Sequence, residues 1–489
     1  MKNTLLLDQL IKIQQQQMIS FHMPGHKNGR IFERLPYKNF KNILTYIDTT
    51  EISGTDNLHH PKGAIKKAQE RASRLMGSEE TFFLVNGSTS GIYSMIMAVT
   101  NPGDKVIIGR NCHKAVINGL ILGDCIPCYL APTVDPVQGI ALEITPASVE
   151  RMLLEQPDAK AVVITYPTYH GVASDLKKIA EIVHKYDKIL LVDEAHGAHL
   201  GLSEALPKTA LECGADIVVQ STHKTLPAFT QSSMLHIQGS RVDRDKLKFM
   251  LRLHQSSSPS YLLMASLDVA MTIYESHGKE LMGELLNHVK EFKSSMKEYE
   301  GVVLFDEDDF SEATASLYTL DPTKLWISLQ RKGISGVQLE EELRSTFGIQ
   351  MELSNLYGVL GIGTIGNEKK DFIQLAKAIE GINSLSKTYT SYTTIIGHNV
   401  KSPLMMEIPQ WALTPKEALY REKRTVRLQE AIGLISGTTI TPYPPGIPIL
   451  MPGEVINKGL IQYIKAITSM GMEVIGLKDD TQLLIDVIK

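Results

Sequence analysis

The sequence has little cysteine, no long apolar run and no large excess of either charge. Its 489 residues include only four cysteines, which is too few for a disulfide-stabilised scaffold and fits a reducing compartment. No apolar run reaches the roughly 18 residues that a membrane span requires, and Asp8 stands where a signal peptide would extend its apolar region. A net charge of −4 gives no reason to expect nucleic acid or an anionic membrane as a partner. We therefore expect a cytoplasmic protein whose partners are small molecules and further copies of itself.

Two groups of residues have types that occur in metal or redox sites, but the sequence does not favour such a site at either group. Cys125-Ile126-Pro127-Cys128 has the spacing of a redox motif, but it reads better as the start of an apolar strand, and no second cysteine pair completes a zinc site. The other group is an aspartate with two histidines: Asp193, His196 and His199. Their spacing does not fit one helical face, and a glycine interrupts the helix there, so we expect no bound metal.

Strands and helices alternate repeatedly from about residue 80 onward. The expected strands are short and apolar, and a turn and then a helical pattern follow most of them. They cover residues 81–85, 105–109, 126–131, 160–166, 188–192 and a run that ends near 220. Such a repeat predicts a mainly parallel sheet with helices on both faces, and hence an α/β fold.

The chain is too long for one hydrophobic core, and its pattern changes along its length. An amphipathic segment and polar loops come first, the alternating region follows, and a mixed α+β pattern begins near residue 300. We predict an N-terminal arm with active-site loops at 1–60, a large sheet domain at 61–290, a small α+β domain at 291–395 and a C-terminal domain at 396–489.

One strand ends in a lysine that we expect to be chemically active. The run from Val218 to Gln220 passes into Ser221-Thr222-His223-Lys224. Open α/β sheets bind ligands outside the carboxyl ends of their strands, which is where Lys224 falls. An unpaired ammonium is costly to bury, and imine formation with an aldehyde cofactor removes that charge. This stretch alone leaves open that Lys224 is an ordinary surface lysine.

Other strand ends bring polar groups to the same edge of the sheet. In chain order the set is the Ser88-Thr89-Ser90 turn, His113, Asp193 and the His223-Lys224 pair. The serine-rich turn opens a helix whose free N–H groups favour a phosphate, although a plain helix cap uses the same residue types. A lysine, a carboxylate, a flat ring and a phosphate cradle are the groups that pyridoxal 5'-phosphate needs, so we predict this cofactor.

Five motifs in the same order closely resemble the Orn/Lys/Arg decarboxylase family. They are His22-Met23-Pro24-Gly25-His26-Lys27, Asn86-Gly87-Ser88-Thr89-Ser90, Asp193-Glu194-Ala195-His196, Ser221-Thr222-His223-Lys224 and Tyr443-Pro444-Pro445-Gly446-Ile447-Pro448. The resemblance extends from about residue 20 to the C-terminus. It implies the aspartate-aminotransferase type of fold, known as fold type I of pyridoxal-phosphate enzymes.

The resemblance assigns a role to each motif residue. Lys224 would hold the cofactor through an imine, Asp193 would pair with the pyridine nitrogen, and His223 would act beside the imine. His113 would stack on the ring above Ala195, and His196 is counted among the cofactor-binding residues. The residues implied for phosphate binding are Ser88, Thr89, Ser90 and Ser221.

The implied reaction is decarboxylation of a basic amino acid, with arginine ahead of lysine and ornithine. Its product would be agmatine, cadaverine or putrescine, for polyamine biosynthesis or acid resistance. The alternatives are another enzyme of this fold, such as an aminotransferase, or a catalytically silent binding protein. The family's larger members carry an additional N-terminal domain, whereas this chain begins at the short arm. We therefore expect a homodimer or a pair of dimers, with active sites at the subunit interface.

Two further observations bear on the substrate. Aminotransferases of this fold commonly hold the α-carboxylate with an arginine of the small domain, and no arginine occurs between Arg344 and Arg421. That gap favours decarboxylation, because a carboxylate held tightly as an ion is stabilised in the ground state. The basic end of the substrate needs a carboxylate. The candidates are Asp48, Glu51, Asp56, Glu430 and Glu454. Separately, we expect residues 56–60 to form the loop that a neighbouring subunit adds to the active site.

Overall fold

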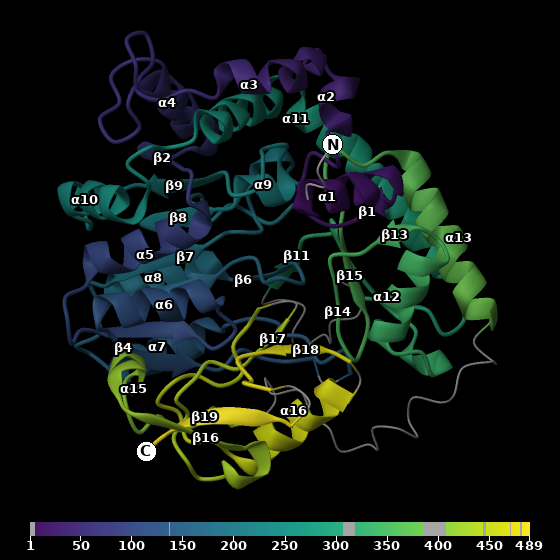
Figure 1. Cartoon of the computed structure of the whole chain (residues 1–489). Coiled ribbons are helices and arrows are strands. Elements are labelled where there is room, and N and C mark those ends of the chain that lie inside the picture. Colours follow the sequence, from purple (N-terminus) through teal and green to yellow (C-terminus); the bar gives the residue numbers. More distant parts are fainter. Residues whose placement is uncertain are drawn as a thin grey trace.

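The computed structural model describes residues 5–135, 137–306, 318–385, 407–443, 446–469, 471–479 and 482–489. Three groups of elements are visible: a large sheet with its helices, a smaller sheet with α12 and α13, and a C-terminal unit beneath them (Figure 1). Within those residues, no helix has the length and apolar character needed to cross a membrane.

A seven-stranded sheet forms the centre of the large domain, in the spatial order β2-β9-β8-β7-β5-β3-β4. Its strands are β2 (Glu80–Leu84), β3 (Lys105–Gly109), β4 (Ile126–Leu130), β5 (Ala161–Thr165), β7 (Ile189–Asp193), β8 (Ile217–Gln220) and β9 (Ser233–Ile237). The pairs from β4 through β8 are parallel, whereas β9 runs antiparallel to both of its neighbours. The predicted mainly parallel sheet is confirmed, and the reversed strand β9 was not predicted.

Helices cover both faces of this sheet because its central strands are apolar on both sides. One face packs against α5 (Gly87–Val99), α6 (Lys114–Gly123) and α10 (Arg244–His254). The other face packs against α7 (Pro146–Glu155), α8 (Leu176–Lys185) and the 36-residue α11 (Tyr261–Met296). Since Val106 and Ile107 belong to different core clusters, alternate side chains of β3 serve opposite faces, as strand geometry requires.

The smaller sheet is antiparallel and lies beside the large domain. It contains β10 (Val303–Leu304), β12 (Lys324–Ser328), β15 (Val359–Ile362) and β14 (Leu353–Ser354), in that order. The helices α12 (Gly336–Ser345) and α13 (Lys369–Leu385) accompany it (Figure 1). Two separate two-stranded sheets join segments of this region to other parts of the chain: β1 (Ile19–Ser20) with β13 (Ile349–Gln350), and β11 (Tyr318–Leu320) with β6 (Val172–Ser174). An α+β unit therefore follows the large domain, and the predicted boundaries stay predictions.

The C-terminal unit has its own core and reaches the large domain. It contains α15 (Pro415–Tyr420), α16 (Lys458–Ser469) and two strand pairs, β16 (Lys423–Arg427) with β19 (Leu484–Ile488) and β17 (Thr441–Tyr443) with β18 (Glu473–Ile475). Leu450 and Ile464 lie in its own apolar cluster, whereas Met451 lies in a cluster of the large domain. The segment around residue 450 is therefore shared between the two units.

The described N-terminal part contains four α-helices, and the residues between them form loops, the short strand β1 and a 3-10 turn. The elements are α1 (Leu5–Gln15), α2 (Arg30–Arg34), α3 (Leu44–Ile47) and α4 (Ala64–Met76). No residue of α1 is buried, and Leu5 and Leu6 are 86% and 71% exposed. An apolar helix with this exposure fits the expected arm toward a partner subunit.

Candidate active site

Lys224 lies where β8 passes into a single helical turn, α9 (Thr222–Thr225). Its Nζ is 2.9 Å from His196 Nε2. Burial lowers the pKa of Lys224, a nearby Lys324 lowers it further, and Asp193 opposes both. A lysine with a lowered pKa has more of the uncharged amine that attacks an aldehyde.

Asp193 closes β7 and is 2% exposed. Its Oδ1 accepts the backbone N–H of Ala195 at 3.1 Å. Burial raises the pKa of this carboxyl, and the positive charge of Lys224 opposes that rise. A carboxylate in such a place is stabilised by a second positive charge, and a protonated ring nitrogen would supply one.

His113 sits at the N-terminus of α6 with its ring fixed by the backbone. Its Nδ1 accepts the N–H of Ala115 at 3.2 Å, so this nitrogen carries no proton. Burial lowers the pKa of His113 to about 4, with a further contribution from Lys224. The ring is therefore neutral at pH 7 and can stack on a flat cofactor.

The predicted phosphate end lies at the start of α5. The Ser221 hydroxyl donates to Ser88 Oγ at 2.7 Å, which joins this turn to the strand end before Lys224. Ser90 donates to the carbonyl of Gly87 at 2.8 Å. Ser88 lines the pocket, whereas Thr89, Ser90 and Ser221 are not among its lining residues. Helix α5 has 13 residues, so its free N–H groups and dipole favour an anion at this end.

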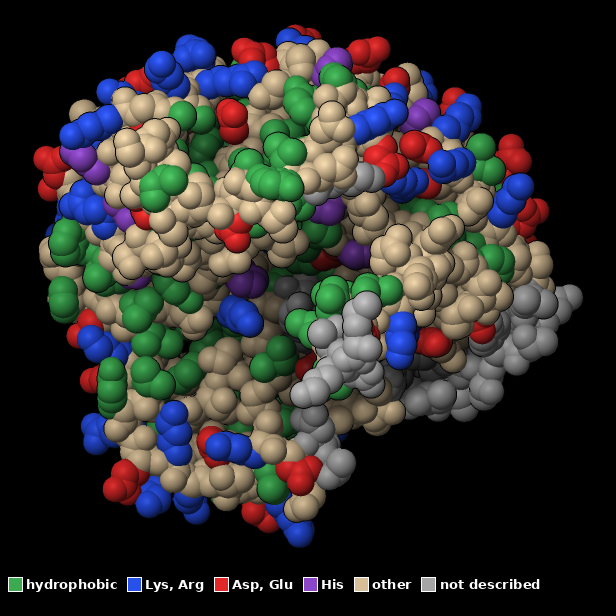
Figure 2. All heavy atoms as spheres, turned by 45° about the horizontal axis from the view of Figure 1, so that its top comes forward, with side chains coloured by type: hydrophobic (Ala, Val, Ile, Leu, Met, Phe, Trp, Pro, Cys, Tyr) green, Lys and Arg blue, Asp and Glu red, His purple; other side chains and the backbone are tan. Residues whose placement is uncertain are grey.

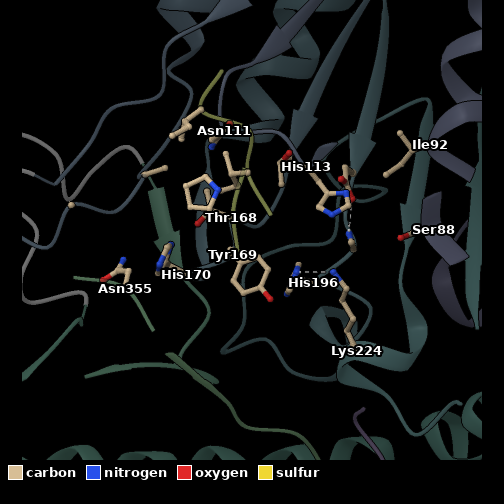
Figure 3. A pocket seen from close by; sticks show the side chains of 18 of the residues that line it. Ser88, Ile92, Asn111, His113, Thr168, Tyr169, His170, His196, Lys224 and Asn355 are labelled. Atoms are coloured by element: carbon tan, nitrogen blue, oxygen red, sulfur yellow. Dashed lines mark hydrogen bonds between the residues drawn. The ribbon is translucent and has the colours of Figure 1, made fainter. Parts of the chain in front are cut away.

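These groups surround one pocket, which holds about 1110 Å³ of empty space including its mouth. Figure 3 shows Lys224, His196 and His113 toward one end and His170 and Asn355 toward the other. In the space-filling view the molecule is hollowed near the centre of one face, where histidine side chains gather (Figure 2). The wall includes residues of all three units: Ser88, Ile92, Asn111, His113, Gly139, Ala141, Thr165, Thr168, Tyr169, His170, Asp193, Ala195, His196, Lys224, Asn355, Pro442, Ile447, Ile449, Tyr463 and Met472.

Several buried polar atoms on this wall have no hydrogen-bond partner within the described part of the chain. They are Asn111 Oδ1, Thr165 Oγ1, His170 Nε2 and His196 Nδ1. An unsatisfied buried polar atom costs about 1–3 kcal/mol, so such a cluster indicates a polar ligand. The donor set, with one amine, one buried carboxyl and one neutral ring, fits pyridoxal 5'-phosphate.

His223 is not among the residues that line this pocket. Its Nδ1 is 2.9 Å from the carbonyl oxygen of Ser232, and burial lowers its pKa to about 4. The ring in hydrogen-bond contact with Lys224 belongs to His196. A role for His223 in proton transfer stays a prediction, and no contact with the wall supports it.

Tyr169 and Glu352 belong to the site, and sequence reasoning missed both. The Tyr169 ring packs against His196 at 4.3 Å between centroids, and Lys224 Nζ lies 5.9 Å from its centre. The Tyr169 hydroxyl donates to Glu352 Oε1 at 2.6 Å, and Glu352 Oε2 accepts the N–H of Met23 at 3.0 Å. Tyr169 follows a predicted strand, so its position gave a usable signal, whereas nothing in the sequence marked Glu352.

The His22–Lys27 motif forms a loop between α9 and the smaller sheet. The N–H of Gly25 donates to the carbonyl of His223 at 2.8 Å. A Cβ at Gly25 would lie 2.6 Å from the carbonyl oxygen of Leu226, so only glycine fits there. Lys27 is fully buried and donates to the carbonyl of Ile362 at 3.0 Å. Burial lowers the pKa of Lys27 to about 7.

The five acidic residues proposed for the basic end of the substrate do not line the pocket of this chain. Asp56 accepts backbone N–H groups of Gly63 and Ile65 at the start of α4. Glu454 is buried against Arg110. The others, Asp48, Glu51 and Glu430, are exposed on the surface. Residues 444–445 of the predicted Tyr443–Pro448 motif lie outside the described part of the chain.

Glu194, next to Asp193, provides a stability prediction. It is fully buried, accepts hydrogen bonds from the Ala210 N–H and the Gln220 amide, and has its pKa raised by burial to about 8. In the unfolded chain its pKa is near 4.5. The folded form therefore binds the proton more tightly, and this contribution to stability falls by about 1.4 kcal/mol per pH unit as pH rises between these values.

We expect Glu194→Gln to remove this pH dependence. Between pH 5 and pH 8 the unfolding free energy of the variant should therefore rise relative to that of the parent. Urea denaturation at several pH values measures it, with the exposed Glu181→Gln as a control. A difference that stays constant with pH would show that Glu194 is already ionised in the folded protein.

Comparisons with known proteins agree with this geometry. Residues 4–371 match the family model described as Orn/Lys/Arg decarboxylase, major domain, and residues 398–485 match its C-terminal domain. The chain is 38% identical to an arginine decarboxylase of Bacillus subtilis (strain 168), over 97% of this chain and 95% of the relative. It is 37% identical to an arginine decarboxylase of Halalkalibacterium halodurans, with 96% and 94% covered. Among solved structures, lysine decarboxylase A from Pseudomonas aeruginosa matches with a TM-score of 0.81 at 22% identity, covering 96% of this chain and 78% of that one.

Proposed function

The chain belongs to the Orn/Lys/Arg decarboxylase family and is an amino-acid decarboxylase, and from this premise we propose that it converts L-arginine to agmatine and CO₂ with pyridoxal 5'-phosphate. The observation that carries the proposal is the meeting of Lys224, Asp193 and His113 on one pocket wall. Relatives named arginine decarboxylase cover nearly the full length of the chain, which supports arginine over lysine or ornithine.

We infer a distinct task for each group around the cofactor. Lys224 would hold it through a C–N link, because its amine is the group that can react with the aldehyde of the cofactor. Asp193 keeps the ring nitrogen protonated, His113 stacks on the ring, and Ser88 with the start of α5 holds the phosphate. The bound cofactor supplies the electron sink that accepts the bonding pair left when CO₂ departs.

Burial lowers the pKa values of His196 and Lys224, the two side chains that we assign to holding and transferring a proton at this site. The pKa of His196 lies well below its ordinary value because the ring is buried near Lys224. A neutral His196 Nε2 can accept a hydrogen bond from Lys224 Nζ and so direct the nitrogen's lone pair. Lys224, once released, is the group we assign to return a proton to Cα.

The pocket wall also supports loss of CO₂ over transamination. Within the described part of the chain it contains no arginine, and the sequence has none between Arg344 and Arg421. A substrate carboxylate there lacks the bidentate partner that would stabilise its charge. Such a carboxylate can leave as neutral CO₂ without losing a strong ion pair.

The working form that we propose is a cytoplasmic homodimer or pair of dimers. The exposed leucines of α1 and the polar loop around Asp56–His60 are the parts we assign to contacts between subunits. Since this chain contributes no carboxylate beyond Asp193 to the described pocket wall, we assign the acid that binds the guanidinium to the neighbouring subunit. Four free thiols fit a reducing compartment. Polyamine biosynthesis or acid resistance is the process we propose for the product.

CO₂ release from arginine, lysine and ornithine tests this function. We expect arginine to be preferred at least tenfold in kcat/KM, which corresponds to about 1.4 kcal/mol of transition-state binding. Keto-acid formation, measured in the same samples, should be negligible. Equal low rates on all three amino acids, or keto acid as the main product, would contradict the assignment.

A further inference from the structure

A buried ion pair joins the end of β3 to the C-terminal unit. Arg110 Nη2 lies 3.1 Å from Glu454 Oε2, and the two residues are 6% and 0% exposed. The same guanidinium donates to the carbonyls of Pro448 and Ile449, at 2.5 Å and 3.2 Å. Glu454 Oε2 also accepts the N–H of Met451 at 2.8 Å. One arginine therefore fixes the backbone of this C-terminal segment.

The ion pair connects two parts of the chain that both contribute to the pocket wall. Arg110 is followed directly by Asn111 and, two residues later, by His113, and both line the pocket. In the C-terminal unit, Ile447 and Ile449 line the same pocket. The distance between the cofactor-stacking ring and the apolar wall thus depends on how Arg110 holds its partners.

Stability alone does not explain a buried ion pair at this place. Desolvation of two charges offsets most of their attraction, and apolar residues of similar volume often stabilise a protein as well. The segment is also already anchored, because Met451 lies in a core cluster of the large domain and its Sδ accepts the Tyr129 hydroxyl at 3.2 Å. A guanidinium adds a planar set of hydrogen-bond donors, which fixes the orientation of the carbonyl and carboxylate groups that accept from it.

We propose that Arg110 and Glu454 are positioning residues that hold Ile447 and Ile449 at a set distance from the cofactor and so select the length of the basic side chain. This inference rests on the proposed function. Arginine, lysine and ornithine differ in length, and one methylene in a fitted apolar pocket changes kcat/KM by about 10- to 200-fold. If Ile447 and Ile449 can shift, the pocket no longer distinguishes substrates whose side chains differ by one methylene.

The test compares Glu454→Ala with Glu454→Gln in the full-length enzyme loaded with cofactor. For Glu454→Ala we expect KM for the preferred amino acid to rise at least tenfold, kcat to change less than threefold, and the preference among the three substrates to fall below threefold. Glu454→Gln keeps the shape and an acceptor oxygen, so it should restore much of the discrimination. The cofactor absorbance should be the same in both variants.

A second variant guards against loss of folding. The double substitution Arg110→Met with Glu454→Leu removes both charges and fills the same buried space with apolar side chains, so we expect the protein to fold. Its preference among the three amino acids should still be lost. Without cofactor, amide hydrogen exchange at Leu450 and Met451 should be at least tenfold faster in this variant. The surface pair Lys185–Glu150, replaced by two alanines, is the matched control and should change nothing.

The possible results separate the two hypotheses. The pair has no positioning role if the substrate preference of all three variants stays within threefold of the parent and their hydrogen exchange is unchanged. A parent enzyme that releases no CO₂ from any basic amino acid would overturn the proposed function instead. In that case the hydrogen exchange still decides whether the pair orders the segment.

Discussion

Replacement of Lys224 by alanine should lower CO₂ release about 1000-fold or more and abolish the visible absorbance of the bound cofactor. The reason is that the amine both forms the C–N link and is the group assigned to return a proton to Cα, and losses of single catalytic groups of these kinds each reach two to four decades. Burial lowers the pKa of Lys224 and so raises the fraction of uncharged, reactive amine in the parent protein, whereas the variant has no amine at this position. Absorbance spectra and a CO₂ assay measure both effects.

Mass spectrometry gives an independent result for the same lysine. Borohydride treatment of the parent should fix the cofactor on Lys224 and on no other residue, and the alanine variant should carry no adduct. Lys185→Ala, a surface lysine paired with Glu150, is the control and should retain full activity. An adduct on a different side chain would contradict the assigned chemistry and would leave the fold unaffected.

Replacement of Asp193 by asparagine should keep the cofactor bound and lower kcat about 100-fold. Asparagine has the same shape and can still accept the Ala195 N–H, but it carries no charge to keep a ring nitrogen protonated. A lost electrostatic contact of this kind typically costs two to three decades in kcat. The loss should appear in kcat with little change in KM, because the interaction strengthens as charge develops.

The pH dependence of the cofactor absorbance tests the same residue. Asp193 is the carboxylate that we assign to the ring nitrogen, so its removal should shift the pH at which the cofactor absorbance changes. Asp216→Asn is a matched control, because Asp216 is equally buried but binds His184 and the Leu190 N–H away from the pocket. Its titration should follow the parent. An Asp193→Asn variant with parental kcat would remove this carboxylate from the mechanism.

Much of the site was predictable because strand ends in a parallel sheet meet at one edge. Ser88, His113, Asp193 and Lys224 each directly follow a strand, or lie within a few residues of its end, so local pattern alone placed them together. The central sheet followed from the same alternation. The reversed direction of β9 could not be read, because strand direction depends on how the chain returns across the sheet and not on side-chain pattern.

The roles of histidines were harder to predict than their positions. His223 is adjacent to Lys224 in sequence, but successive residues of a helical turn point about 100° apart, so its ring meets Ser232 instead. His196 instead follows the end of β7, and its Nε2 lies 2.9 Å from Lys224 Nζ. Glu352 and the Arg110–Glu454 pair depend on contacts between residues far apart in the chain, 344 positions for that pair, and no local pattern encodes them.

The loop around Gly25 links the backbone next to the reactive lysine to the smaller sheet. Gly25 bonds to the carbonyl of His223, the residue just before Lys224, and its own carbonyl accepts the Thr364 hydroxyl at 2.8 Å. Arg30 adds an ion pair to Asp371 on α13. The backbone just before the reactive lysine is therefore tied through one short loop to the smaller sheet and to α13, so the position of the amine depends on how those elements pack.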